Sequence, residues 1–254
     1  MKGKKVLILG VANKRSLAWA MAQRFSAAGA ELFLTYQGER FQRELDKLVK
    51  DLPVIPKLAV CDVTREEDIA ALGLALHEWG GVDVLVHSLA FAPPEAMRSE
   101  FSRATRQAFI TALEISAYSL VALTRMAIPL FEARGGGSVM TLSYLGAERI
   151  VPGYHIMGVA KAALEASVRY LAYELAPKGI RVNAISPGPV RTLSAAGVSG
   201  FNKLLDAMPD KSVLRRNITP EEVAELAFFL AGQGGRPLTG ETLYVDAGCH
   251  LMGA

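Results

Sequence analysis

Short apolar runs alternate with longer amphipathic segments from one end of the chain to the other. The short runs predict β-strands at 5–9, 31–35, 57–60, 82–87, 138–142, 181–185 and 242–245. The longer segments repeat apolar residues at helical spacing and predict helices at 16–28, 39–50, 66–78, 101–133, 157–176 and 220–231. The run at 6–9, Val-Leu-Ile-Leu, is continuously apolar, which is typical of a strand covered on both faces. The pattern therefore predicts an α/β fold with a doubly wound parallel sheet of about seven strands, flanked by helices on both faces.

No repeat, low-complexity stretch or linker interrupts this alternation, so we expect residues 1–254 to form a single domain. A chain of this length that is 51% hydrophobic can bury one sizeable core. The least regular stretch, 187–208, follows the sixth predicted strand and begins Pro-Gly-Pro. Loops at the carboxyl ends of parallel strands are where such sheets bind ligands. We therefore expect a substrate-binding lid near 192–208.

Charge and cysteine content exclude several classes of function. The net charge is +3 without a basic run, which argues against nucleic-acid binding. Cys61 and Cys249 stand far apart, and the four histidines lack ligand spacing, so we expect neither a disulfide framework nor a metal site. The first apolar run is too short for a signal peptide or a membrane span. We expect a cytoplasmic protein that does not enter a membrane.

The segment after the first strand has the composition of a phosphate-binding loop. Gly10 permits a sharp turn, and small residues at 12, 16 and 18 allow close approach of a pyrophosphate. The helix that opens at Ser16 and Leu17 would present amide donors and a favourable dipole. Ser16 is equally suited to be only the helix N-cap.

The ends of the second and third strands favour NADH over NADPH. Gln37 can hydrogen-bond a neutral adenosine, and Glu39 would repel a 2′-phosphate, although Arg40 would attract one. Asp62 and Val63, after the third strand, offer the adenine a carboxylate acceptor and an apolar wall. A surface-turn aspartate is the alternative.

Tyr154 and Lys161 indicate catalysis. Lys161 falls on the edge of an apolar helical stripe, where it must either extend to solvent or meet hydrogen-bond acceptors. Tyr154, seven residues earlier, has nearly the same direction around a helix and lies roughly 10 Å along its axis. A phenol donor beside an ammonium suits an oxygen that gains negative charge during a reaction.

The combined motifs resemble the short-chain dehydrogenase/reductase superfamily and, within it, the bacterial type I enoyl-acyl carrier protein reductases. The resemblance covers essentially the whole chain, and its most specific block is 141–162. Six residues separate Tyr154 from Lys161, where ordinary members of the superfamily have three, and Tyr144 stands where they place a serine. Further matches are Ser-Leu-Ala-Phe-Ala-Pro at 88–93 and Asn-Ala-Ile-Ser-Pro-Gly-Pro-Val-Arg-Thr-Leu at 183–193.

The resemblance implies a Rossmann-like fold and NADH-dependent reduction of the trans-2 double bond of enoyl-acyl carrier protein thioesters, in the elongation cycle of bacterial type II fatty acid biosynthesis. Tyr154 would stabilise the enolate oxygen, Lys161 would hold the nicotinamide ribose, and Tyr144 would line the pocket. The implied cofactor-binding residues are Gly10, Ser16, Leu17, Gln37, Asp62, Val63, Ser88, Leu89, Lys161, Val190 and Thr192. The implied substrate-binding residues are Ala92, Tyr144, Tyr154, Met157 and Phe201.

The resemblance also implies an acyl carrier protein as partner and a homotetramer. Family members often carry basic residues where the acidic carrier docks, and here Lys203 is the only cation of the stretch 198–204. Two alternatives remain open: an NAD(P)H-dependent carbonyl or alcohol reductase of the same superfamily, and a module that senses NADH without turnover.

Overall fold

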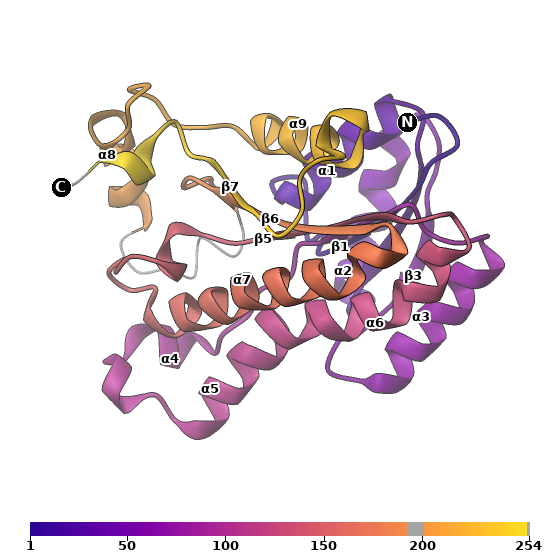
Figure 1. The fold of residues 1–254 in the computed structure, drawn as a ribbon. Helices are drawn as coiled ribbons and strands as arrows, with labels where there is room; N and C mark the ends of the chain where they lie inside the picture. The colour runs from indigo at the N-terminus through magenta and orange to yellow at the C-terminus, as the bar shows by residue number, and fades with distance from the viewer. Residues whose placement is uncertain (193–200, 253–254) are drawn as a thin grey trace.

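The computed structural model describes residues 1–192 and 201–252, apart from the side chain of residue 201. Seven parallel strands form one sheet in the order β3-β2-β1-β4-β5-β6-β7, which confirms the predicted fold class (Figure 1). The strands are β1 (Lys5–Leu9), β2 (Glu31–Tyr36), β3 (Lys57–Val60), β4 (Val84–His87), β5 (Gly137–Leu142), β6 (Ile180–Pro187) and β7 (Thr242–Val245).

Helices cover both faces of the sheet because alternate strand residues point in opposite directions. Val6 and Ile8 of β1 join one buried cluster, with α1 (Leu17–Ala27), α2 (Glu39–Leu48) and α9 (Pro220–Ala231). Leu7 and Leu9 join the other, with α3 (Glu66–Glu78), α6 (Ser119–Glu132) and α7 (His155–Leu175). Figure 1 shows α1 and α9 above the sheet and α3, α6 and α7 below it.

The strand order reverses between β1 and β4, and the segments that follow these two strands meet at Gly10. This residue has φ of +97°, and a Cβ on it would lie 2.0 Å from the carbonyl oxygen of Ser88. Glycine is required at this position both by its backbone conformation and by the close approach of the segment after β4. The reversal point is where sheets of this kind bind ligands.

The single helix predicted at 101–133 is wrong, because the structure divides this stretch into several helical segments. Thr105 caps α5 (Arg106–Leu113) by accepting a hydrogen bond from the amide of Ala108, which separates this helix from a 3-10 turn at Phe101–Arg103. Between α5 and α6 the helix widens into a π-helix at Glu114–Tyr118. The stretch Arg106–Glu132 is long and apolar enough to cross a membrane by length and composition alone, but half of its most apolar window is buried inside the protein.

Two helices stand where the sequence predicted irregular structure. One is the short α4 (Pro94–Arg98), which has Pro94 at its first position. The other is α8 (Phe201–Lys211), which replaces the second half of the expected loop at 187–208. Leu205 and Met208, buried on α8, are three positions apart and share one helix face. The first part of the expected lid, residues 193–200, lies outside the described residues.

Candidate active site

The carboxyl ends of the parallel strands bring most of the predicted site residues to one edge of the sheet. Each connection leaves its strand there, so side chains far apart in the sequence gather at this edge. The residues concerned are Gly10 after β1, Gln37 after β2, Asp62 and Val63 after β3, Ser88 and Leu89 after β4, Tyr144 after β5, and Val190 and Thr192 after β6.

Two residues predicted to meet the adenosine hydrogen-bond each other. The Gln37 side-chain amide donates to Asp62 Oδ2 at 2.9 Å. Asp62 Oδ1 accepts from the amide and the hydroxyl of Thr64. Partial burial acts to raise the pKa of Asp62, but the hydrogen bonds from Gln37 and Thr64 outweigh it and leave that pKa below its usual value. An ionised carboxylate with a fixed orientation therefore lies at the end of β3.

Ser16 is the N-cap of α1. Its hydroxyl donates to the carbonyl oxygen of Asn13 at 2.7 Å and accepts from the amide of Trp19 at 3.3 Å. This arrangement fixes the first turn of α1 close to Gly10, at the reversal point of the sheet. The amides of that turn and the side-chain-free surface of Gly10 suit a pyrophosphate.

Lys161 is buried in α7 and meets a backbone acceptor. Its Nζ donates to the carbonyl oxygen of Leu142, at the end of β5, at 2.7 Å, and only 3% of the residue is exposed. Burial lowers the pKa of Lys161 to about 8, although the nearby Glu165 carboxylate acts to raise it. At neutral pH the group is still mostly protonated, and two further hydrogens remain for hydroxyl acceptors.

Tyr154 lies just outside α7, at the cap position before His155, with φ of −109° and ψ of 0°. The predicted helix 157–176 also leaves out Tyr154, but the expected direction of its side chain assumed helical geometry, which does not continue to this residue. Its ring packs edge-to-face on that of Tyr144, with 4.8 Å between centroids and 68° between planes. Burial raises the pKa of Tyr154 well above its usual value and that of Tyr144 to about 12, so both phenols are neutral hydrogen-bond donors at pH 7.

Two glycines allow the chain to close around Tyr154. A Cβ on Gly146 would lie 2.4 Å from Cδ1 of the Tyr154 ring. A Cβ on Gly158, in the first turn of α7, would lie 2.6 Å from the carbonyl oxygen of Gly146. The segment 145–147 is therefore in direct contact with both the helix and the phenol.

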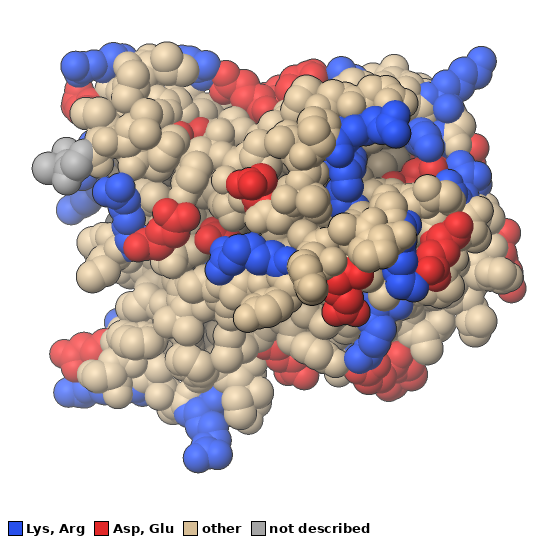
Figure 2. Space-filling view, in the orientation of Figure 1, with Lys and Arg blue, Asp and Glu red and all other residues tan. Residues whose placement is uncertain are grey.

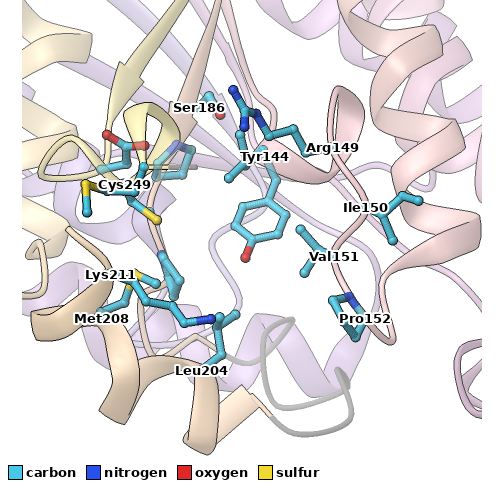
Figure 3. A pocket seen from close by; sticks show the side chains of 16 residues that line it. Tyr144, Arg149, Ile150, Val151, Pro152, Ser186, Leu204, Met208, Lys211 and Cys249 are labelled. Atoms are coloured by element: carbon cyan, nitrogen blue, oxygen red, sulfur yellow. The ribbon is translucent and has the colours of Figure 1, made fainter. Parts of the chain in front are cut away.

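A cavity of about 250 Å³ opens beside Tyr144, whose hydroxyl points into it (Figure 3). Its walls come from the segment after β5, the end of β6, α8 and the C-terminal segment, with Lys211 of α8 and Cys249 on the side across from Tyr144. The lining residues are Tyr144, Leu145, Arg149, Ile150, Val151, Pro152, Ser186, Pro187, Gly188, Pro189, Leu204, Met208, Lys211, Asp246, Cys249 and Met252.

The other predicted substrate residues divide into two groups. Ala92, Tyr154 and Met157 pack into one small hydrophobic cluster with residues of α4 and α5, so the structure brings them together. Tyr154 contacts the cavity through Tyr144 rather than lining it. The side chain of Phe201 lies outside the described part of the chain.

Three groups near this site were not predicted from the sequence to belong to it. Glu165, one turn after Lys161, is a buried carboxylate. Its position on the apolar side of the helix could have indicated this burial from the sequence. His87 is fully buried at the end of β4, between the hydroxyls of Thr141 and Ser119. The C-terminal residues of the cavity, from Asp246 to Met252, carry no motif and are found only from the tertiary structure.

On the face shown in Figure 2, basic and acidic side chains are interspersed. Among the described residues, no group of three or more His, Cys, Asp or Glu side chains is placed to hold a metal ion.

Comparisons with known proteins agree along the entire chain. A family model described as enoyl-(acyl carrier protein) reductase matches residues 10–250. The NADH-dependent enoyl-(acyl-carrier-protein) reductases of Aquifex aeolicus and Bacillus cereus are each 45% identical to the whole chain, over 93% and 99% of their own lengths. The solved Bacillus cereus enzyme, bound to NADP+ and indole naphthyridinone, has a TM-score of 0.96 at 44% identity, covering 100% of this chain and 98% of that one. The Anaplasma phagocytophilum enzyme in complex with NAD has a TM-score of 0.95 at 45% identity, covering 100% and 96%.

Proposed function

This chain belongs to the enoyl-(acyl carrier protein) reductase family, and we propose that it reduces the trans-2 double bond of enoyl-acyl carrier protein thioesters with NADH. The reaction would serve the elongation cycle of bacterial type II fatty acid biosynthesis. The observation that carries this proposal is the constellation of Tyr144, Tyr154 and Lys161 at the carboxyl edge of the sheet: the two phenol rings are in contact, and the buried ammonium is held at Leu142, two residues before Tyr144.

The proposed chemistry needs an oxyanion stabilised outside water. Bound NADH would supply a hydride to the β-carbon of the thioester. The negative charge that then moves to the thioester carbonyl oxygen would be stabilised by a hydrogen bond donated by the Tyr154 hydroxyl, and a proton from solvent at the α-carbon would complete the saturated product. A phenol with a raised pKa stays protonated throughout and serves as a donor rather than a base. Tyr144 lines the acyl pocket, and the positive charge of Lys161 adds to the stabilisation.

The residues that would hold NADH lie along the edge of the sheet in the same order as the adenosine, pyrophosphate, ribose and nicotinamide of the cofactor. Asp62, Val63 and Gln37 would meet the adenosine, while Gly10, Ser16 and Leu17 would meet the pyrophosphate. Lys161 would bind the nicotinamide ribose with two of its three ammonium hydrogens, because it already donates the other one to the carbonyl oxygen of Leu142. Ser88, Leu89, Val190 and Thr192 would surround the nicotinamide.

The preference for NADH over NADPH rests on the end of β2. The carboxylate of Glu39 opens α2 and would repel a 2′-phosphate. The Bacillus cereus relative was solved with NADP+, and a comparison of initial rates with NADH and NADPH tests the preference of this chain.

We further propose a homotetramer. α7 exposes Val159, Tyr170 and Tyr173, of which the two tyrosines are 77% and 86% exposed. Ile110 of α5 and Tyr118 before α6 are also about half exposed. Apolar side chains on adjacent long helices suit burial across two-fold axes. Light scattering at micromolar concentration should give four times the 27.3 kDa chain mass; a monomer would reject the proposal.

The remaining features of the proposal are the partner, the lid and the location. An acyl carrier protein would deliver the substrate, with Lys203 of α8 as the one cation of 198–204. Residues 1–254 would act as a single domain, with its lid near 192–208. The protein would be cytoplasmic, without a membrane or nucleic-acid partner.

Crotonyl and acetoacetyl thioesters, each supplied with NADH and then NADPH, test the function. We expect NADH oxidation with the crotonyl substrate and formation of the butyryl product. Reduction of the acetoacetyl thioester alone would assign the chain to the carbonyl reductases. Tight NADH binding without oxidation of either substrate would favour the sensing module.

A further inference from the structure

Glu165 is a buried carboxylate that the proposed reaction does not use. It lies one turn after Lys161 on α7 and is only 6% exposed. The hydroxyl of Ser143 donates a short hydrogen bond to its Oε1. Burial raises the pKa of Glu165, while the Ser143 hydrogen bond opposes this. Because burying a carboxylate is costly, its presence so close to the site calls for a compensating role.

The hydrogen bond joins Glu165 to Ser143, which lies between two residues of the proposed active site. Leu142, on one side of Ser143, provides the carbonyl oxygen that accepts from Lys161 at 2.7 Å. Tyr144, on the other side, packs its ring against Tyr154. The Ser143 amide donates to the carbonyl oxygen of Ile185 in β6 at 2.7 Å. Ser143 is thus attached to β6 through its backbone and to α7 through its side chain.

We propose that Glu165 is a positioning residue of this reductase. Through Ser143 it holds the segment 142–144 against α7, and its carboxylate lies within electrostatic reach of the ammonium of Lys161. One side chain then orients both the acceptor of Lys161 and the ring that supports Tyr154. The inference rests on the proposed function, because it concerns the same site.

Charged and titratable groups from several elements face this pair. On α7 itself, Lys161 and Arg169 act to lower the pKa of Glu165. Glu148, after the 3-10 turn at Leu145–Ala147, acts to raise it, and Tyr244 of β7 is within its electrostatic reach.

Lys161 has a second titratable neighbour, His87 of β4. Burial and the charge of Lys161 together lower the pKa of His87 to about 3, so His87 is neutral wherever Lys161 titrates. Glu165 is the group that opposes the lowering of the Lys161 pKa. Removing its charge should therefore lower that pKa further.

Three variants separate the two parts of the role. Glu165→Gln keeps an acceptor for Ser143 but removes the charge, whereas Ser143→Ala removes the hydrogen bond but keeps the charge. Glu174→Gln makes the same chemical change at an exposed position of the same helix and serves as the control. Circular dichroism and thermal melting establish that each variant is folded.

The first measurement needs neither cofactor nor substrate. Lysine labelled with ¹³C at Cε reports the pKa of Lys161 by NMR, with its resonance assigned by its loss in Lys161→Met. We expect this pKa to fall by about one unit in Glu165→Gln, as for the loss of a nearby opposite charge. It should change less in Ser143→Ala, which keeps the charge and affects only the orientation of the Leu142 acceptor, and it should stay unchanged in Glu174→Gln.

The second measurement is steady-state reduction of crotonyl thioester by NADH. We expect Ser143→Ala to lose about 10-fold in kcat with little change in KM, because the phenols are displaced without loss of the substrate pocket. The proposal would be overturned by an unshifted Lys161 pKa in Glu165→Gln or by a wild-type kcat in Ser143→Ala. The kcat of Ser143→Ala still tests the proposal if Glu165→Gln does not fold. A wild-type protein that fails to reduce crotonyl thioester would contradict the proposed function instead, while the NMR titration would still report on Glu165.

Discussion

Gly146→Ala tests whether the position of the Tyr154 phenol limits the reaction. The added Cβ would lie 2.4 Å from Cδ1 and 2.9 Å from Cε1 of the Tyr154 ring. Ordinary van der Waals contact begins at 3.4 Å, so the ring or the 145–147 segment must move by about 1 Å. The Tyr144 ring and Gly158 restrict that movement. A misplacement of this size near the reacting atoms costs on the order of 10²-fold in rate.

We therefore expect Gly146→Ala to lose about 10²-fold in kcat/KM for crotonyl thioester, measured by NADH oxidation. Overpacking should also cost roughly 1–3 kcal/mol of stability. NADH binding, followed by fluorescence titration, should be unchanged, because the nearest atoms to the added Cβ belong to the rings of Tyr154 and Tyr144, which are assigned to the substrate rather than to the cofactor. Gly73→Ala in α3 is the matched control, since its Cβ would meet only the flexible side chain of Met126, at 3.0 Å. Wild-type kcat/KM in a folded Gly146→Ala protein would refute the idea that the Tyr154 ring is rigidly held.

Three further predictions follow from the same structure. Tyr154→Phe should retain NADH binding and lose about 10²-fold in kcat, the cost of one oxyanion donor; an unchanged kcat would remove Tyr154 from that role. NADH affinity should decrease as pH rises through about 8, where Lys161 loses its charge, and Lys161→Met should bind NADH weakly without this pH dependence; equal affinities would contradict ribose binding. His87 is neutral in the folded state down to a pKa of about 3 and protonates near 6.5 when unfolded, so it contributes stability above pH 6.5 that is lost as pH falls towards 3. Urea unfolding should show that loss as about 1.4 kcal/mol between neutral pH and pH 5.5, and the loss should be absent in His87→Asn.

The sequence predicted the sheet well because each strand is a short run with apolar residues, and the central strands β1 and β4 are almost continuously buried on both faces. β1, β3, β7, α3 and α9 begin and end at the predicted residues. The gathering of the residues proposed for the cofactor could be predicted, because parallel topology brings the ends of distant strands to one edge of the sheet.

The features that were not predicted from the sequence depend on individual hydrogen bonds and on packing between distant segments. The Thr105 cap ends the predicted helix on its N-terminal side, and the hydrogen bond that its side chain accepts from Ala108 leaves no trace in the hydrophobic periodicity. α8 escaped prediction because Gly and small residues precede it, although Leu205 and Met208 share a buried face. The cavity wall from Asp246 to Met252 depends on packing between chain segments that no motif connects. Glu165 was overlooked because a glutamate in a helix is usually taken as solvated.

The six-residue gap between Tyr154 and Lys161 has a structural consequence for how the site is controlled. A gap of three residues places both groups on one helical face, and the helix then fixes their relative position. With six intervening residues, Tyr154 falls outside α7, and the helix backbone no longer sets the direction of the phenol. Contacts from Gly146 and Tyr144 take over that task. Lys161, by contrast, remains fixed by the helix and by Leu142. The phenol and the ammonium are therefore held by different parts of the chain, joined through the segment 142–147, so that changes in this segment should alter turnover more than they alter cofactor binding.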